Sequence, residues 1–240
     1  MSSPESKDRS ARHCALRVIR VGHRGAAGHA PENTLAAIDA GIACGVDFVE
    51  IDLRCTSDGI IVALHDATVN RTTDGTGRIA RLSLQDVKRL VAGKGQQIPT
   101  LQEVLDAAGG RAGLMLELKV RGIAGQVVTA VHQAGFKKPV IYASFLYDEL
   151  PQVQEADPDA DRMALFDRLP NPSVARATRY AASCVGLRHD RATRRLIESF
   201  HHSNLRVFVY TANHPSDIER ALSLGVDGII SNFPDRIPRG

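Results

Sequence analysis

The sequence has no long apolar run, no basic stripe and few cysteines. No stretch approaches the roughly 18 consecutive apolar residues of a membrane-spanning helix, so we expect no stable membrane insertion. The net charge over 240 residues is only +3 and the arginines are scattered, so nucleic acid is not an expected partner. Hydrophobic residues make up 43% of the chain and charged residues 24%, which is typical of a single soluble globular domain.

Cysteine usage and the first residues bear on the cellular compartment. The chain has four cysteines: Cys14, Cys44, Cys55 and Cys184. They show neither CxxC spacing nor the density of a disulfide scaffold, which favours reduced thiols and a cytoplasmic protein. The N-terminal residues are mostly polar and lack the apolar segment of a signal peptide. Because such residues bury too little apolar surface to offset the entropy of ordering, we predict a disordered tail at 1–16 and one domain at 17–240.

Short apolar runs alternate with helical patterns along the chain. Helices are predicted to end near Ala43 and to occupy residues 101–108, 124–134 and 215–224. Eight parallel strands are predicted: residues 18–22, 46–53, 113–120, 140–143, 163–166, 184–187, 205–210 and 228–231. Eight such units predict an α/β fold, the TIM (β/α)8 barrel, in which loops at the carboxyl ends of the strands build the active site.

Residues 60–65 form an additional apolar run after the turn dipeptide Asp58-Gly59. An Asp-Gly pair is a strong hairpin signal. A parallel return would need a crossover of about a dozen residues or more. We therefore predict an antiparallel arm, outside the eight-strand count, that brings His65 opposite the strand of Glu50 and Asp52.

Residues 66–99 interrupt the alternation after the second strand. They contain a turn-rich segment at 71–77 and one short amphipathic segment at 83–91. Long loops that do not build a scaffold are commonly lids or binding elements. We predict a small inserted cap region that helps to select the substrate.

Charged side chains stand at or near the ends of the predicted strands. Glu50 and Asp52 are two residues apart, as are Glu117 and Lys119, and this spacing places each pair on one strand face. Inward-facing carboxylates need a cation. Glu50, Asp52 and Glu117 offer hard oxygen ligands, which suit Mg²⁺ or Ca²⁺ better than zinc. A structural ion pair between Glu117 and Lys119 inside the barrel is the alternative.

Two histidines and an arginine complete this group. His23-Arg24-Gly25 follows the first strand and His65 ends the predicted arm, within about forty residues of each other. Imidazole titrates near neutral pH, and arginine presents a planar fork to phosphate oxygens. We interpret the group as a metal-assisted phosphodiesterase site.

These motifs resemble those of the glycerophosphodiester phosphodiesterase family, from about residue 18 to residue 235. The matching motifs are His-Arg-Gly at 23–25, Pro-Glu-Asn-Thr at 31–34, Glu-Ile-Asp at 50–52, Thr-Ser-Asp-Gly at 56–59, His-Asp at 65–66, Arg-Thr-Thr-Asp-Gly-Thr-Gly at 71–77, Ile-Pro-Thr-Leu at 98–101, Glu-Leu-Lys at 117–119, Ser-Phe at 144–145, Tyr-Thr-Ala-Asn at 210–213 and Ser-Asn-Phe-Pro at 231–234. The resemblance implies a distorted TIM barrel with an inserted cap and a divalent metal. It also implies a phosphoric diester hydrolase that converts glycerophosphodiesters, such as deacylated phospholipids, to sn-glycerol 3-phosphate and an alcohol.

Such a reaction assigns a role to each candidate residue. The charge of the phosphodiester must be neutralised, and protons must be exchanged at the attacking and leaving oxygens. Arg24 and Lys119 are interpreted as phosphate-binding clamps. His23 is assigned as the general base and His65 as the general acid. The nucleophile is either water or the neighbouring glycerol hydroxyl, the latter passing through a cyclic phosphate.

Other positions are assigned less specific roles. Tyr210 stands where the family usually has tryptophan, and Ala143 where the residue is often polar. We interpret both as lying near the substrate alcohol, so they bear on head-group preference. Glu32 is assigned a structural role at a helix start, and turn chemistry explains Asn213 and Asn232 as well as substrate contact does. The remaining histidines are expected to be packed or solvated: His13, His29, His132, His189, His201, His202 and His214.

Two alternative functions stay open. A lysophospholipase D-like lipid phosphodiesterase needs a greasy entrance or a membrane-facing loop, and no amphipathic basic helix stands out in the sequence. A barrel that binds a phosphorylated ligand without turnover is the second alternative. The presence of both histidines and all three carboxylates argues against it.

Overall fold

Eight parallel strands form a closed barrel in the computed structural model, which describes residues 17–168 and 173–239. The sheet order is β1-β9-β8-β7-β6-β5-β4-β2-β3, and an additional β1–β2 pairing closes the ring. The ring strands are β1 (Ile19–Gly22), β2 (Phe48–Cys55), β4 (Gly113–Leu118), β5 (Val140–Ser144), β6 (Asp161–Phe166), β7 (Cys184–Arg188), β8 (Arg206–Tyr210) and β9 (Gly228–Ser231). The predicted TIM barrel is confirmed, and every predicted strand overlaps an observed one.

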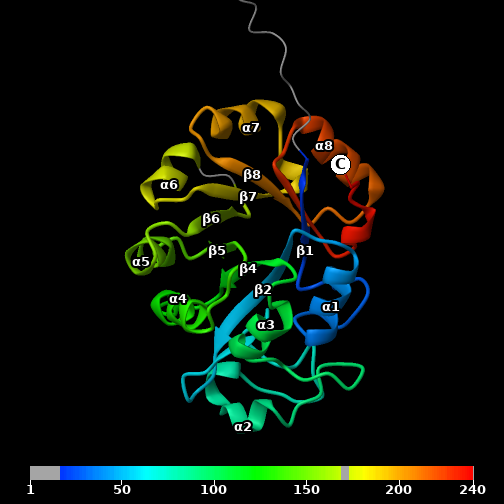
Figure 1. The fold of residues 1–240 in the computed structure, drawn as a ribbon, viewed down its shortest axis with the longest axis vertical. Helices are drawn as coiled ribbons and strands as arrows, with labels where there is room; N and C mark the ends of the chain where they lie inside the picture. Colours follow the sequence, from blue (N-terminus) through cyan, green and yellow to red (C-terminus); the bar gives the residue numbers. More distant parts are fainter. Residues whose placement is uncertain (1–16, 169–172, 240) are drawn as a thin grey trace, which may run out of the picture.

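Helices surround this ring of strands, as Figure 1 shows. They are α1 (Leu35–Ala43), α3 (Leu101–Ala108), α4 (Ala124–Gln133), α5 (Glu149–Ala156), α6 (Ser173–Arg179), α7 (Arg194–His201) and α8 (Pro215–Leu224). Short 3-10 helices precede α7 (η2, His189–Arg191) and follow β9 (η3, Pro234–Arg236). Helix α1 begins after Thr34, whose side chain accepts a hydrogen bond from the Ala37 N–H. Helix α3 begins with a capping box between Thr100 and Glu103. These caps satisfy N–H groups that have no partner inside the helix, and so they fix where each helix begins.

Alternate residues of each strand face opposite sides of the barrel wall. In β2, Val49 and Ile51 pack outward in an apolar cluster with the helices. Phe48 joins a separate apolar cluster inside the barrel. Glu50 and Asp52 share the inward face with Phe48 and are only 4% and 1% exposed. The predicted common face of the two carboxylates is therefore the interior one.

The arm that follows β2 lies outside the ring. β3 (Ile61–Ala63) pairs antiparallel with β2, with Leu53 opposite Ala63 and Cys55 opposite Ile61. This confirms the predicted arm, because the Asp58-Gly59 turn returns the chain beside the strand it has just left.

The inserted region after β3 has an apolar core of its own and extends past the ring next to α3 in Figure 1. It contains η1 (Ile79–Arg81) and α2 (Leu84–Val87). The amphipathic segment at 83–91 is helical only over α2, because Arg89 and Leu90 form tighter turns to the carbonyls three residues earlier. The tail predicted at 1–16 lies outside the described residues.

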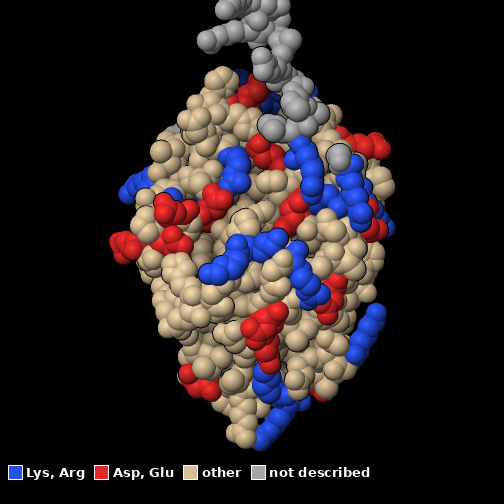
Figure 2. Space-filling model, in the orientation of Figure 1, with Lys and Arg blue, Asp and Glu red and all other residues tan. Residues whose placement is uncertain are grey.

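The surface charge and the helices of the described residues bear on two predictions, that the protein binds no nucleic acid and does not insert into a membrane. Lysine and arginine are interspersed with aspartate and glutamate over the face shown in Figure 2. Across residues 17–168 and 173–239, the helices are too short or too polar to cross a membrane. The absence of a nucleic-acid partner stays a prediction.

Candidate active site

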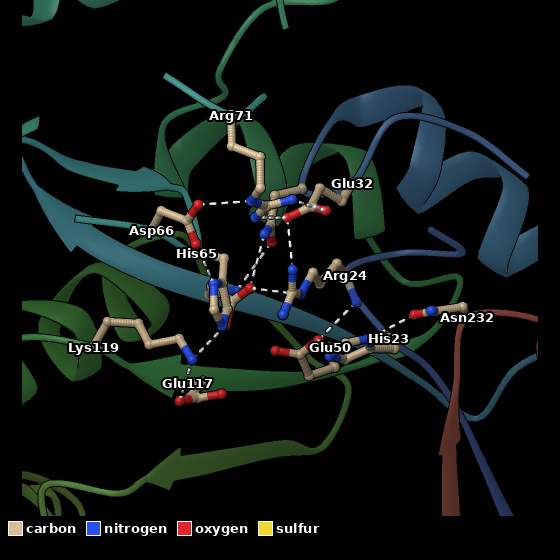
Figure 3. Close-up of polar contacts among 12 residues, drawn as sticks. His23, Arg24, Glu32, Glu50, His65, Asp66, Arg71, Glu117, Lys119 and Asn232 are labelled. Atoms are coloured by element: carbon tan, nitrogen blue, oxygen red, sulfur yellow. Dashed lines mark hydrogen bonds and ion pairs between the residues drawn. The ribbon is translucent and has the colours of Figure 1, made fainter. Parts of the chain in front are cut away.

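Figure 3 shows six of the seven candidate residues gathered at one site, and Asp52 belongs to the same site through its contacts with Arg24 and Lys119. His23 and Arg24 follow β1, His65 follows the β3 arm, and the others lie on or next to the ends of two neighbouring strands: Glu50 and Asp52 on β2, Glu117 on β4 and Lys119 after it. Asp52 and Glu117 are direct register partners across these strands. Six of the seven line a pocket of about 200 Å³, and Asp52 is buried beside it.

A strained turn presents Arg24 to this pocket. Its φ of 52° is in the left-handed region, which costs a non-glycine residue roughly 1–3 kcal/mol. The Arg24 N–H donates to Glu50 Oε2 at 2.7 Å, and the Gly25 N–H donates to the Glu50 carbonyl at 3.0 Å. Gly25 is itself required, because a Cβ there would lie 2.4 Å from the carbonyl carbon of Ala37. The turn is thus fastened to the strand that carries the carboxylates.

Three buried carboxylates form an acidic cluster beneath the pocket. One ligand oxygen from each of Glu50, Asp52 and Glu117 lies within 4.8 Å of the other two. Lys119 Nζ makes ion-pair contacts of 3.0 Å with Asp52 Oδ1 and 2.6 Å with Glu117 Oε1. Glu50 Oε1 is buried without a hydrogen-bond donor, and the buried Asp52 Oδ1 and Glu117 Oε1 have only these ion-pair contacts with Lys119. Buried acceptors without donors are costly, and three convergent carboxylate oxygens fit a hard divalent cation.

The pKa values of the three carboxylates shift in different directions. Burial, reinforced by the negative charges of Asp52 and Glu117, raises the pKa of Glu50 well above its usual value. Burial raises the pKa of Glu117 to about 7. Burial also opposes ionisation of Asp52, but Lys119 and Arg24 outweigh it and lower its pKa to about 2. Lys119 and Arg24 thus compensate the charge of Asp52 and leave the other two carboxylates undercompensated.

The two histidines lie on the pocket wall with different partners. His23 Nδ1 lies 2.6 Å from Asn232 Oδ1, and its Nε2 lies 4.0 Å from Glu50 Oε2. His65 Nδ1 lies 2.6 Å from Asp66 Oδ1. Because an amide or carboxylate oxygen accepts, each Nδ1 carries a proton and each Nε2 is left for chemistry.

The pKa of each histidine reflects burial and its neighbours. Burial, followed by the charge of Arg24, lowers the pKa of His23 to about 4. Burial also lowers the pKa of His65, although Asp52 and Asp66 act in the opposite direction. The carboxylate of Asp66 stabilises an imidazolium, whereas the neutral amide beside His23 gives much less support to one.

Sequence reasoning missed a set of contacts made by Glu32 and Asn33. Thr34, and not Glu32, caps α1, and Glu32 Oε1 accepts a hydrogen bond from Arg24 Nη1 at 2.7 Å. Asn33 Nδ2 donates to Asp52 Oδ2 at 2.8 Å. Both residues belong to the Pro-Glu-Asn-Thr motif, which was the available signal.

Apolar side chains form the other half of the pocket: Met115, Ala143, Phe145, Leu165, Tyr210 and Ile230, next to Thr211. Phe145 and Tyr210 meet edge to face with ring centroids 6.1 Å apart. Lys119 Nζ lies 5.8 Å from the centre of the Phe145 ring. Ala143 and Tyr210, the two positions that depart from the family pattern, therefore both line the pocket. The described lining of the pocket includes no residue of the inserted region 66–99.

Known proteins are similar to this chain in sequence and in fold. Residues 23–236 match the Glycerophosphoryl diester phosphodiesterase family. A glycerophosphodiester phosphodiesterase from Caldanaerobacter subterraneus subsp. tengcongensis is 30% identical, over 92% of this chain and 97% of its own. A phosphodiesterase from Oleispira antarctica, solved in complex with the product sn-glycerol-3-phosphate, is 27% identical with a TM-score of 0.85, over 93% of this chain and 96% of its own. A glycerophosphodiester phosphodiesterase from Agrobacterium tumefaciens is 30% identical with a TM-score of 0.81, over 92% of this chain and 99% of its own.

Proposed function

The chain belongs to the glycerophosphoryl diester phosphodiesterase family, and we propose that it hydrolyses glycerophosphodiesters to sn-glycerol 3-phosphate and an alcohol by metal-assisted acid–base catalysis. The observation that carries the proposal is one pocket lined by two cationic side chains, two histidines and the buried carboxylates of Glu50 and Glu117, of which Glu50 Oε1 has no hydrogen-bond donor. The product bound to the Oleispira antarctica relative supports sn-glycerol 3-phosphate as the product here.

Glu50, Asp52 and Glu117 would hold a divalent cation, which we propose to be Mg²⁺ or Ca²⁺. All three offer carboxylate oxygens and converge within 4.8 Å, as hard cations require. When bound, the cation neutralises charge on the phosphodiester and orients it.

Arg24 and Lys119 are proposed to bind the phosphate oxygens. Glu32 fixes one end of the Arg24 guanidinium, and Asp52 lies 3.3 Å from its Nε. Lys119 lies above the same carboxylates, at the boundary with the apolar half of the pocket. Both cations stabilise the negative charge that grows on phosphate oxygens in the transition state.

The partners of the histidines support His23 as the general base and His65 as the general acid. Burial and the charge of Arg24 keep the His23 ring neutral, and with Nδ1 held by Asn232 its Nε2 can accept a proton. Asp66 stabilises the protonated form of His65, which can then protonate the leaving alcohol oxygen. The nucleophile deprotonated by His23 is water or the glycerol hydroxyl. A cyclic phosphate seen by phosphorus NMR during turnover would select the hydroxyl.

The apolar half of the pocket favours one alternative substrate class. Phe145 is 38% exposed and could contact an acyl chain, as a lysophospholipase D-like enzyme requires. Glycerophosphocholine and lysophosphatidylcholine share a head group and differ by that chain. We expect faster turnover of glycerophosphocholine, and faster turnover of the lysolipid would favour the alternative.

A cytoplasmic location is part of the proposal. Cys44, Cys55 and Cys184 are all free thiols in the described part of the chain, as expected in a reducing compartment. Localisation of the tagged protein in its source cell tests this part separately from the chemistry.

A substrate panel tests the proposed function. Glycerophosphodiesters with different alcohols are incubated with the enzyme and Mg²⁺, Ca²⁺ or Mn²⁺, and sn-glycerol 3-phosphate is detected by a coupled dehydrogenase assay. We expect product with at least one metal. Ligand binding without product under all three metals would instead favour a non-catalytic phospho-ligand-binding barrel.

A further inference from the structure

Arg71, in the inserted region, donates hydrogen bonds to the carboxylates of Glu32 and Asp66 (Figure 3). These two carboxylates in turn contact two separate groups of the site. Arg71 Nη1 and Nη2 donate to the two oxygens of Glu32 at 2.8 Å each, and Arg71 Nε donates to Asp66 Oδ2 at 2.7 Å. Glu32 also accepts from Arg24, and the other oxygen of Asp66 accepts from His65. One guanidinium therefore links the proposed phosphate clamp to the proposed general acid.

We infer that Arg71 is a positioning residue of the phosphodiesterase site, which fixes the place of the general acid relative to the phosphate clamp. The inference rests on the proposed function, because it presupposes that His65 and Arg24 act on the same phosphodiester. Arg71 is absent from the described pocket lining, so its effect passes through Glu32 and Asp66. The inserted region thus contributes to the chemistry without lining the pocket.

The geometry of these contacts requires arginine. A guanidinium carries five N–H donors in one plane, and Arg71 uses one edge for Glu32 and the Nε side for Asp66. A lysine ammonium is a point charge and cannot hold two carboxylates in this fixed arrangement. The hydrogen bond from Arg71 lowers the pKa of Asp66, and Arg71 and Arg24 together outweigh burial to lower the pKa of Glu32. Both carboxylates therefore stay ionised and keep accepting.

A simpler role for Arg71 is that of a surface ion pair that fastens the inserted region to the barrel. Its side chain is 48% exposed, and exposed ion pairs contribute little on their own. A fastening role would change stability and would affect all substrates equally. A positioning role acts through the general acid. The loss of kcat in a variant then depends on how much the leaving group of the substrate needs a proton.

Two substrates and three variants separate these roles. Glycerophosphocholine releases an alkoxide that needs a proton, whereas the p-nitrophenyl ester of glycerol 3-phosphate releases a stable phenolate that does not. Arg71→Lys keeps the charge and removes the fork. Asp66→Asn weakens the contacts of this carboxylate with His65 and Arg71, and Glu32→Gln weakens those with Arg24 and Arg71. We measure kcat and KM of each for both substrates, with melting temperature as a folding check.

Loss of such supporting contacts typically costs about 10- to 100-fold in activity. We expect Arg71→Lys and Asp66→Asn to lower kcat for glycerophosphocholine by about this factor and to lower kcat for the nitrophenyl ester much less. Glu32→Gln should raise KM or lower kcat for both substrates alike. Adding Arg71→Lys to the Glu32→Gln/Asp66→Asn double variant should cost little more, because Arg71 then has no ionised carboxylate left to hold.

The outcome separates failure of this inference from failure of the proposed function. Unchanged kcat and KM in Arg71→Lys, or equal losses for both substrates, overturn the positioning role while the wild-type enzyme still turns over. A wild-type protein without turnover of either substrate overturns the proposed function instead. If Arg71→Lys does not fold, the difference between substrates in Asp66→Asn decides. Arg89→Lys, in an exposed arginine of the same region that pairs with Asp86 at 3.7 Å, is the matched control and should behave as wild type.

Discussion

Asn33 and Asp52 hold each other by two hydrogen bonds between a loop and a strand. Asn33 Nδ2 donates to Asp52 Oδ2 at 2.8 Å, and the Asp52 N–H donates to Asn33 Oδ1 at 3.1 Å. Asn33 has a φ of 57°, a left-handed conformation that asparagine tolerates better than most residues. The pair therefore fixes the carboxylate that sits deepest in the acidic cluster.

Replacing Asn33 should weaken both folding and cation binding. Asn33→Ala removes both hydrogen bonds and leaves a buried N–H and carboxylate oxygen without these partners, which costs roughly 1–3 kcal/mol each. We expect a lower free energy of unfolding in urea and weaker Ca²⁺ binding by calorimetry. Asn33→Gly, which tolerates the left-handed φ, separates backbone strain from loss of the side chain. If Asn33→Ala matches wild type in both measurements, the pair has no energetic role.

Glu50 should lower the stability of the cation-free protein and contribute to cation binding. Its ionised form is unfavourable because of burial and the nearby Asp52 and Glu117. In a chelator at pH 8, Glu50→Gln should therefore raise the free energy of unfolding by roughly 1–3 kcal/mol. Added Ca²⁺ should raise the melting temperature of wild type, because binding stabilises the folded state, and should have little effect on the variant. An equal Ca²⁺-induced rise in both proteins would remove Glu50 from the cation site.

Cys184 should make stability fall at alkaline pH. Burial raises its pKa to about 12, above the value of about 8.5 for an exposed thiol. Stability from the protonated thiol is complete below about pH 8.5 and is lost as pH rises towards 12, because the unfolded chain ionises first. One such group contributes a slope of up to about 1.4 kcal/mol per pH unit.

The Cys184→Ala variant isolates this contribution. Urea unfolding between pH 9 and 11 should give a shallower decline of the unfolding free energy in the variant than in wild type. The absolute stability of the variant also falls because a cavity is left, so only the slopes are compared. Parallel slopes would show that Cys184 does not titrate in this way.

His65 is predicted to supply acid catalysis. His65→Ala should lower kcat for glycerophosphocholine by about 10²- to 10⁴-fold with little change in melting temperature, because the His65 side chain is 33% exposed. His132→Ala is the matched control, since His132 pairs with Asp157 at 3.0 Å in a separate pocket. Wild-type kcat in His65→Ala would exclude His65 from the mechanism.

The strands and the inward carboxylates could be predicted from the sequence because they depend on local periodicity. Residues 228–231 were predicted and observed as the same strand, and Glu50 and Asp52 share a face whatever the rest of the fold. The arm carrying His65 was predictable because Asp58-Gly59 specifies a hairpin. The connection between the two strands is also too short for the crossover that a parallel pair needs.

The contacts between loops could not be predicted in the same way. Arg71 meets Glu32 across 39 residues of sequence, and both lie in irregular segments without a period. Their meeting depends on the path of the inserted region over the barrel, which is set by its own small core. The sequence therefore indicates a role for Glu32 at the neighbouring helix start, although its partners are Arg24 and Arg71.

The dependence of hydrolysis on a cation held by Glu50, Asp52 and Glu117 is tested most directly by chelation and metal replacement. Release of sn-glycerol 3-phosphate from glycerophosphocholine is measured after treatment with a chelator, and again after addition of Mg²⁺ or Ca²⁺. We predict loss of activity on chelation, recovery of wild type with one of these cations, and no recovery of Glu117→Gln. Hydrolysis at the untreated rate by the fully chelated wild-type enzyme would contradict the account.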